Sequence, residues 1–331
     1  MINILRFMSI NHINIPFFTA NFSSISKFRP DVRKVQELLP GCILAVGEYK
    51  GYVRAVDESR WHLPYLSLLE IQRVLSKEGK AFDWDEFIWL SGAEEGTQEK
   101  SAYADMYRWT KAYVETWQRL SQRPVFNTGV MERMMSLALG RRKQVRVGSK
   151  YGFDFQEWMR SADAYIHLAD EWDSVTRSFI YADAIDRLKP FHQHGDPLKE
   201  LLPGMLIAIE YEVPMPLFGL VAAVMRESHP QSVYEGIISG LEATIERMEH
   251  NRSLRQESFE RAKELLPARM QSPLLFNILF SKPAIKVKDL VEGGLVQRQT
   301  AAEYLRTLEE VRLLEGRMIG RERVYRNARM E

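Results

Sequence analysis

The chain of 331 residues has 45% hydrophobic and 27% charged residues, the ordinary range for globular proteins, and its length favours two domains over one. Lys and Arg number 45 against 44 for Asp and Glu, so a net charge of +1 excludes an overall field that would draw the chain to nucleic acid or to an anionic membrane. The single cysteine, Cys42, excludes an internal disulfide and a cysteine-rich metal site. A chain with a single cysteine is compatible with a reducing compartment, so we expect a cytoplasmic protein.

The amino-terminal segment is partly apolar but is interrupted by polar residues and by Pro16. This pattern fits neither a transmembrane helix nor a secretory signal, which would need a basic start and a clean apolar stretch. We therefore predict an ordered or loose arm over residues 1–28 and no association with a membrane.

From residue 29 to residue 271, apolar residues recur at intervals of three and four, which predicts a body of amphipathic helices. The clearest predicted helices are Tyr107–Leu120, Val130–Leu139, Gln156–Leu168, Trp172–Leu188, Leu198–Tyr211 and Val233–Leu265. Between Arg141 and Phe155, polar and apolar residues alternate near two glycines, which indicates a short β-hairpin.

Residues 272–331 show a different order, with three short helices followed by two strands. The predicted elements are helices at 273–280, 287–290 and 298–309, a turn at Gly293-Gly294, and strands at 313–318 and 323–326 separated by Gly320. Two helices, a recognition helix and a two-stranded wing are the order of a winged helix-turn-helix domain. The predicted fold class is thus mainly α.

The predicted winged helix carries eleven basic and eight acidic residues, a modest excess of positive charge. Side chains at the start of a recognition helix reach base edges or phosphates, and a wing tip reaches phosphates. The candidate DNA contacts are Arg298, Gln299, Thr300 and Tyr304 in the third helix and Arg321 and Arg323 in the wing. Since winged helices also contact proteins, a protein partner and a homo-oligomer stay open as alternatives.

The stretch from Leu274 to Tyr325 resembles the carboxy-terminal winged helix of Fic-family proteins, and the helix around Gly240 to Leu266 resembles the family's connector. The residues that carry the resemblance are Phe280, Pro283, Val287-Lys288-Asp289-Leu290, Arg298-Gln299-Thr300-Ala301, Tyr304-Leu305, Leu314-Glu315 and Gly320-Arg321-Glu322. The resemblance implies a Fic-like helical bundle with a small hairpin in residues 29–271.

The family's catalytic loop reads H-P-F-x-D/E-G-N-G-R-x-x-R, followed by two leucines. The corresponding segment here is Lys189-Pro190-Phe191-His192-Gln193-His194-Gly195-Asp196-Pro197-Leu198-Lys199-Glu200-Leu201-Leu202. By the resemblance, Lys189 replaces the general base, Gln193 the metal ligand, and Pro197 and Glu200 the arginines that clamp phosphates. A lysine with a pKa of about 10.4 is protonated at neutral pH and cannot take a proton from a hydroxyl. The loop therefore predicts a degenerate site.

A shifted alignment is the alternative, with His192 or His194 as the base and Lys199 as the phosphate clamp. The two histidines lack a third ligand, so we predict no metal site outside that alternative.

Upstream, Ser91, Glu95 and Gly96 resemble the family's inhibitory motif S/T-x-x-x-E-G/N. The resemblance places Glu95 opposite the second arginine of the loop, a position that Glu200 occupies, so like charges would face each other. An ordinary capped helix turn is the other interpretation of these three residues.

The sequence favours a catalytically degenerate Fic-like protein that acts as a regulatory or binding module, with DNA or a protein as the partner of its winged helix. The alternative is a working protein adenylyltransferase, which would use ATP and Mg²⁺ to transfer AMP to a protein hydroxyl. No other cofactor is predicted.

Overall fold

The computed structural model describes residues 25, 26, 28, 31–56, 59–75, 82–139, 155–168, 172–188, 196–219 and 230–327. The helices are α2 (Val32–Ala55), α3 (Ser59–Leu75), α4 (Trp84–Ser91), α5 (Glu95–Gln98), α6 (Ala104–Gln122), α7 (Thr128–Leu139), α8 (Phe155–Leu168), α9 (Ser174–Leu188), α10 (Asp196–Glu210), α11 (Pro230–Leu265), the 3₁₀ turn η3 (Ala268–Met270), α12 (Pro273–Leu279), α13 (Val287–Glu292) and α14 (Arg298–Glu310). The strands are β1 (Ala284–Ile285), β2 (Glu315–Ile319) and β3 (Glu322–Arg326). The prediction of a mainly helical chain is confirmed, and the predicted hairpin falls on residues 140–154, outside the described ones.

Three helices run through an internal proline: α2 through Pro40, α3 through Pro64 and α10 through Pro203. A proline inside a helix removes a backbone donor and crowds the preceding turn, so local preference alone opposes these helices. Tertiary packing overrides it, because α2 buries a complete face along its length. The helix predicted over residues 233–265 is confirmed as part of the single 36-residue helix α11.

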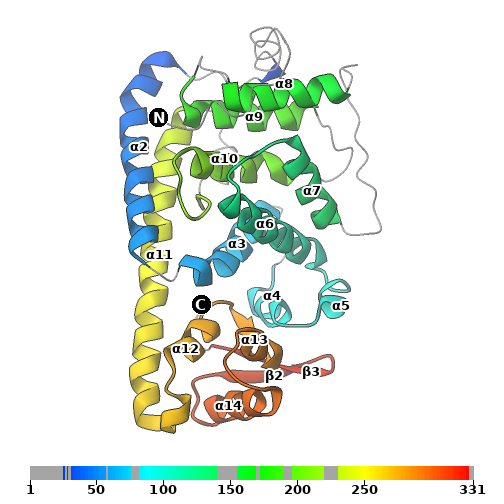
Figure 1. Cartoon of the computed structure of the whole chain (residues 1–331), viewed down its shortest axis with the longest axis vertical. Coiled ribbons are helices and arrows are strands. Elements are labelled where there is room, and N and C mark those ends of the chain that lie inside the picture. Colours follow the sequence, from blue (N-terminus) through cyan, green and yellow to red (C-terminus); the bar gives the residue numbers. More distant parts are fainter. Residues whose placement is uncertain are drawn as a thin grey trace.

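The helices are arranged around the long pair α2 and α11, which lie side by side along one edge of the molecule (Figure 1). Helices α8, α9 and α10 lie at one end, and α3, α6 and α7 lie in the middle. The elements from α12 to β3 lie at the other end, beside the carboxy-terminal half of α11. One large apolar cluster extends from α2 to β3 and joins these layers. The division into domains at residue 271 stays a prediction.

Helix α6 occupies the middle of this core through its aromatic residues. Trp109, Tyr113 and Trp117 are almost fully buried, at positions four residues apart. The indole Nε1 of Trp117 also donates a hydrogen bond to the backbone oxygen of Pro214, at 3.2 Å. Thr110 and Val114 on the same helix are only half-buried, so the three aromatic side chains mark its buried face.

The carboxy-terminal elements follow the order helix, strand, two helices, two strands. The strands form one antiparallel sheet in the order β1, β3, β2, with Ala284 opposite Arg326 and Arg317 opposite Val324. Gly320, at a φ of +63°, makes the tight turn between β2 and β3, a conformation that favours glycine. The observed bounds agree with the predicted helices and strands to within a few residues.

Within the described ranges, no helix is long and apolar enough to cross a membrane.

Candidate functional site

The predicted catalytic loop lies between α9 and α10, which pack against each other. Residues 189–195 fall outside the described residues, and of Asp196 only the backbone is described, as the first residue of α10. The assignments to Lys189, Pro190, Phe191, His192, Gln193, His194 and Gly195 therefore stay predictions. The structure does place the residues on either side of the loop.

Several polar groups beside the loop share Asp183 on α9 as their partner. Its buried carboxylate accepts hydrogen bonds from Ser26 Oγ at 2.9 Å and from the backbone N–H of Phe28 at 3.3 Å. It also pairs with Arg187 Nε at 2.8 Å and with Lys199 Nζ at 3.6 Å. Asp183 thus joins the end of the amino-terminal arm to both helices that flank the loop.

Lys199, the phosphate clamp of the shifted alignment, is held between two carboxylates. Its Nζ lies 3.6 Å from Asp183 Oδ1 and 3.6 Å from Asp186 Oδ2, and its side chain is 27% exposed. A buried or half-buried cation that already has two anionic partners gains little from a third anion. Lys199 is therefore poorly suited to clamp a phosphate.

Most of the residues at the start of α10 have buried side chains. Pro197, at the position of the family's first arginine, is buried, as are Leu198, Leu201 and Leu202. Glu200, at the position of the second arginine, is half-buried. A helix amino terminus can hold a phosphate through its free N–H groups, but carboxylates in the first turn repel it.

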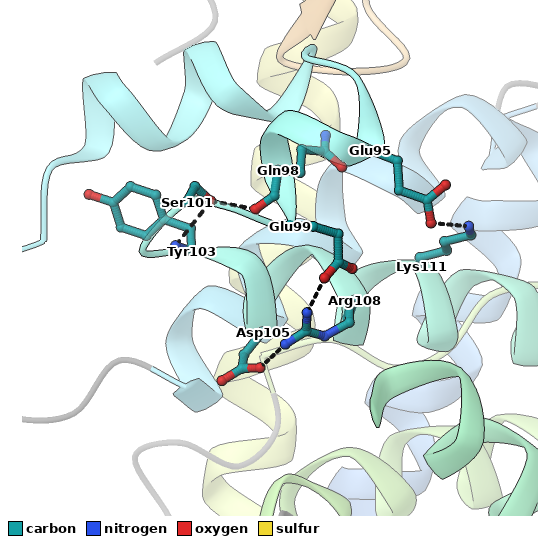
Figure 2. A network of polar contacts seen from close by, with 8 residues as sticks. All are labelled: Glu95, Gln98, Glu99, Ser101, Tyr103, Asp105, Arg108 and Lys111. Carbon is teal, nitrogen blue, oxygen red and sulfur yellow. Dashed lines mark hydrogen bonds and ion pairs between the residues drawn. The ribbon is translucent and has the colours of Figure 1, made fainter. Parts of the chain in front are cut away.

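The inhibitory-motif residues lie at the end of α4 and the start of α5. Ser91 Oγ donates to the backbone oxygen of Ile88 at 2.6 Å, and Gly96 has open space around it. Glu95 pairs with Lys111 on α6, with Oε1 and Nζ 3.0 Å apart (Figure 2). Both side chains are more than half exposed.

Further contacts fix α5 against α6 (Figure 2). Arg108 on α6 pairs with both Glu99 and Asp105. Gln98 Nε2 donates to the backbone oxygens of Leu90 at 3.2 Å and Ser91 at 2.9 Å, which closes the turn between α4 and α5.

The expected opposition of Glu95 and Glu200 is not what the structure shows. Helix α5 lies next to the carboxy-terminal sheet and away from α10 (Figure 1), and Glu95 has a lysine as its partner. The other interpretation, a capped helix turn, is not shown either, because α5 begins after Glu94 without a side-chain cap and Ser91 Oγ bonds the backbone oxygen of Ile88 within α4.

Helix α4 covers one face of the carboxy-terminal sheet. Ile88 and Trp89 pack against Ala284, Val324 and the half-buried Ile319. The contact is close at Gly92, where an added Cβ would lie 2.6 Å from Val324 Cγ1 and 3.0 Å from Ala284 Cβ. This face of the sheet is therefore an internal interface of the chain.

Arg326 closes the edge of that interface. Its guanidinium lies over the Trp89 ring, 5.1 Å from the centroid, and it pairs with Asp85 on α4 and with Glu315 on β2. This group was not predicted from the sequence. Asp85 and Arg326 are 241 residues apart, and neither lies in a recognisable motif.

Two of the residues predicted to contact DNA have their side chains bonded to other residues of this chain. Tyr304 is buried, and its hydroxyl donates to the backbone oxygen of Arg269 at 2.9 Å, so its assignment to a DNA surface was wrong. Arg323 forms two hydrogen bonds with Glu309 on α14, at 3.1 Å and 2.5 Å, and this pairing raises the pKa of the arginine.

The other predicted DNA contacts remain accessible. Arg298 and Gln299 are exposed at the start of α14, Thr300 beside them is half-buried, and Arg321 is exposed at the β2–β3 turn. Of the basic residues from α12 to β3, those without an ion pair in the described part of the chain are Arg298, Arg306, Arg312, Arg317 and Arg321. The β2–β3 turn itself adjoins α5, because a Cβ on Gly320 would lie 3.4 Å from Thr97 Oγ1.

A buried carboxylate, Glu70 on α3, was also missed by the sequence analysis. It accepts a hydrogen bond from the backbone N–H of Gly219 at 3.1 Å, and Arg73 lies 3.6 Å away. Burial raises the pKa of Glu70, and Arg73 and the Gly219 N–H offset part of that effect. Tyr49 and Thr244 hold the same segment through the backbone oxygens of Pro216 and Phe218. Glu70 therefore acts as a structural anchor for residues 213–219.

The described residues contain no group of three or more His, Cys, Asp or Glu side chains that could hold a metal ion. The two histidines of the shifted alignment are outside the described ranges.

Comparison with known proteins finds a similarity in the carboxy-terminal part of the chain. Residues 254–330 match the family model described as Protein adenylyltransferase SoFic-like, C-terminal domain. The resemblance to the Fic family is confirmed over this range, which includes the end of α11 and all elements from α12 to β3. Among solved structures, a Fic family protein from Desulfovibrio desulfuricans G20 matches with 11% sequence identity and a TM-score of 0.43, over 92% of this chain and 99% of that chain.

Proposed function

We propose that this Fic-like chain, whose carboxy-terminal domain is of the SoFic-like type, does not transfer AMP and acts as a regulatory binding module. The observation that supports the proposal is the pairing of the cations beside the predicted loop. Arg187 and Lys199 both contact Asp183, and Lys199 contacts Asp186 as well.

A nucleotide triphosphate needs cations or N–H groups that are free to meet its charge. To bind it, Lys199 would have to leave two carboxylates, each 3.6 Å from its Nζ, whose negative charge already offsets that of the ammonium group. Pro197 and Glu200 stand where the resemblance expects arginines, and Glu200 adds a negative charge. By the resemblance, Lys189 and Gln193 also lack the chemistry of a general base and a metal ligand.

Incubation of the full chain with ATP labelled at the α-phosphate, Mg²⁺ and candidate target proteins tests this proposal. We expect no label on the chain or on other proteins, and Lys189→His alone should not create activity because the phosphate clamps would still be absent. Incorporation of label that is lost in His192→Ala or His194→Ala would contradict the proposal. That result would support the shifted alignment and an adenylyltransferase that uses ATP and Mg²⁺.

As the binding activity, we propose DNA contact by a winged helix formed by residues 272–331, through α14 and the β2–β3 turn. The supporting observation is that Arg298 and Arg321 are exposed and have no ion pair among the described residues. Each phosphate that a cation neutralises adds about 0.9 to the slope of log affinity against log salt concentration.

Arg321→Ala should therefore flatten the salt dependence of DNA binding by about 0.9 in that slope. Arg323→Ala is the matched control and should leave the slope unchanged, because Glu309 already neutralises Arg323. Arg298→Ala should relax the preference for particular sequences if its side chain reaches a base. Absence of DNA binding by the full chain at low salt, together with a changed oligomer mass after deletion of residues 272–331, would assign this domain to protein contact.

A further inference from the structure

Helix α2 has one face in the core and one face in solvent. Its buried residues are Val35, Cys42, Ala45, Val46, Tyr49 and Val53. The helix lies at the outer edge of the molecule, where it packs against α11 (Figure 1). The face opposite the buried residues is therefore exposed along the length of the helix.

Six exposed residues form a line along this face of the helix. Its residues alternate in steps of three and four, and all of them are exposed: Glu37, Pro40, Leu44, Gly47, Gly51 and Arg54. Leu44 has the highest exposed fraction of the large apolar residues in the described chain, at 64%, and its neighbour Ile43 is 40% exposed. A seam of this period faces a second helix when two helices pack side by side. We call these six residues the α2 seam.

No contact within the described part of the chain requires glycine at the two glycine positions of the seam. No heavy atom lies within 4 Å of a Cβ built on Gly47 or on Gly51. A glycine inside a helix costs about 0.5–1 kcal/mol relative to alanine. Close approach of another backbone is the usual benefit that offsets this cost, because glycine leaves room for a large side chain opposite.

We propose that the α2 seam binds the α2 seam of a second copy of this chain, with the two helices antiparallel. The twofold axis passes between Ala45 and Val46, which places Leu44 against Gly47 of the second copy. The same symmetry places Pro40 against Gly51 of the second copy. Leu44 and Pro40, the two apolar side chains of the seam, then each meet a glycine.

Charge complementarity selects a second copy in this orientation. The antiparallel pairing sets Glu37 opposite Arg54 of the second copy, and the symmetry forms this pair twice. A parallel pairing would set Glu37 against Glu37 and Arg54 against Arg54. Within the described residues, Arg54 has no carboxylate partner, and its one hydrogen bond runs from Nη2 to the backbone oxygen of Glu212 at 3.3 Å. The proposal is independent of the function proposed above.

Sedimentation velocity of the full chain over a range of concentrations tests the association. We expect a dimer that Leu44→Glu and Gly47→Gln each convert to a monomer, with melting curves that show folded protein. Leu265→Glu is the matched control, since Leu265 is an exposed leucine on α11 at 46% exposure, and it should leave the dimer intact. A parent chain that is monomeric at every concentration, or a dimer that survives Leu44→Glu, would overturn the proposal.

Charge reversal tests the antiparallel pairing. Glu37→Arg and Arg54→Glu should each raise the dimer dissociation constant about tenfold, because each change sets like charges together at two symmetric positions. The double variant should return the constant to within about threefold of the parent, since the pairs are restored in reverse. Lys34→Glu, a charge reversal on α2 outside the seam, is the control. Failure of the double variant to recover the affinity would exclude this orientation.

Discussion

Replacement of Gly92 by alanine should loosen the contact between α4 and the carboxy-terminal sheet. Gly92 has a φ of −85°, which alanine adopts without strain, so any cost comes from the space around the new Cβ. That atom would lie 2.6 Å from Val324 Cγ1, 3.0 Å from Ala284 Cβ and 3.1 Å from the Ala284 carbonyl carbon. Val324 is fully buried, and the backbone of Ala284 is fixed by its pairing with Arg326. The helix must therefore move away from the sheet.

Overpacking of this kind costs about 1–3 kcal/mol, and alanine recovers about 0.4–1 kcal/mol by restricting the unfolded chain. We expect a net loss of about 1–2 kcal/mol in the free energy of unfolding, which in proteins of 150–250 residues corresponds to about 2–4 °C in Tm for each kcal/mol. Urea and thermal unfolding measure both quantities. Gly96→Ala is the control, because its Cβ would meet no atom within 4 Å. Equal stability of Gly92→Ala and Gly96→Ala would refute the reasoning.

Three further substitutions have defined outcomes. Tyr304→Phe should lower the free energy of unfolding by about 1 kcal/mol, measured in urea, through the lost hydrogen bond to Arg269, and should leave DNA affinity unchanged. Glu95→Gln should change stability by less than about 1 kcal/mol, since its pair with Lys111 is exposed, and should not release AMP transfer in the labelling assay. Glu70→Gln should raise the free energy of unfolding at neutral pH, because the raised pKa of Glu70 in the folded chain favours the neutral form. The gain in stability should shrink as the pH falls toward the pKa of the unfolded chain near 4.5. Urea unfolding at several pH values measures it, and a stability difference that is the same at every pH would contradict this.

The sequence predicted the elements of the carboxy-terminal domain because their signals are local. Pro273 begins α12, the Gly293-Gly294 pair follows α13, and Gly320 makes the β2–β3 turn. Each of these residues acts through its own backbone geometry, which a single sequence reveals. The helices of the body were predicted in the same way from the spacing of their apolar residues.

Side-chain partners were predicted less well because they depend on the tertiary fold. The sequence placed Tyr304 on the DNA surface, although its hydroxyl reaches Arg269, 35 residues away. Glu95 was matched to a position in α10, but packing of α5 on α6 gives it Lys111. The family motif specifies only the spacing of residues along the chain. It does not indicate which residues of other helices lie next to Glu95.

Calorimetric titration of the full chain with ATP in the presence of Mg²⁺ measures whether the cations beside the predicted loop can accept a triphosphate. If Arg187 and Lys199 are occupied by Asp183 and Asp186, the chain should give no saturable heat of binding at ATP concentrations up to about 1 mM. Saturable binding of one ATP for each chain, abolished in Lys199→Ala, would contradict the account.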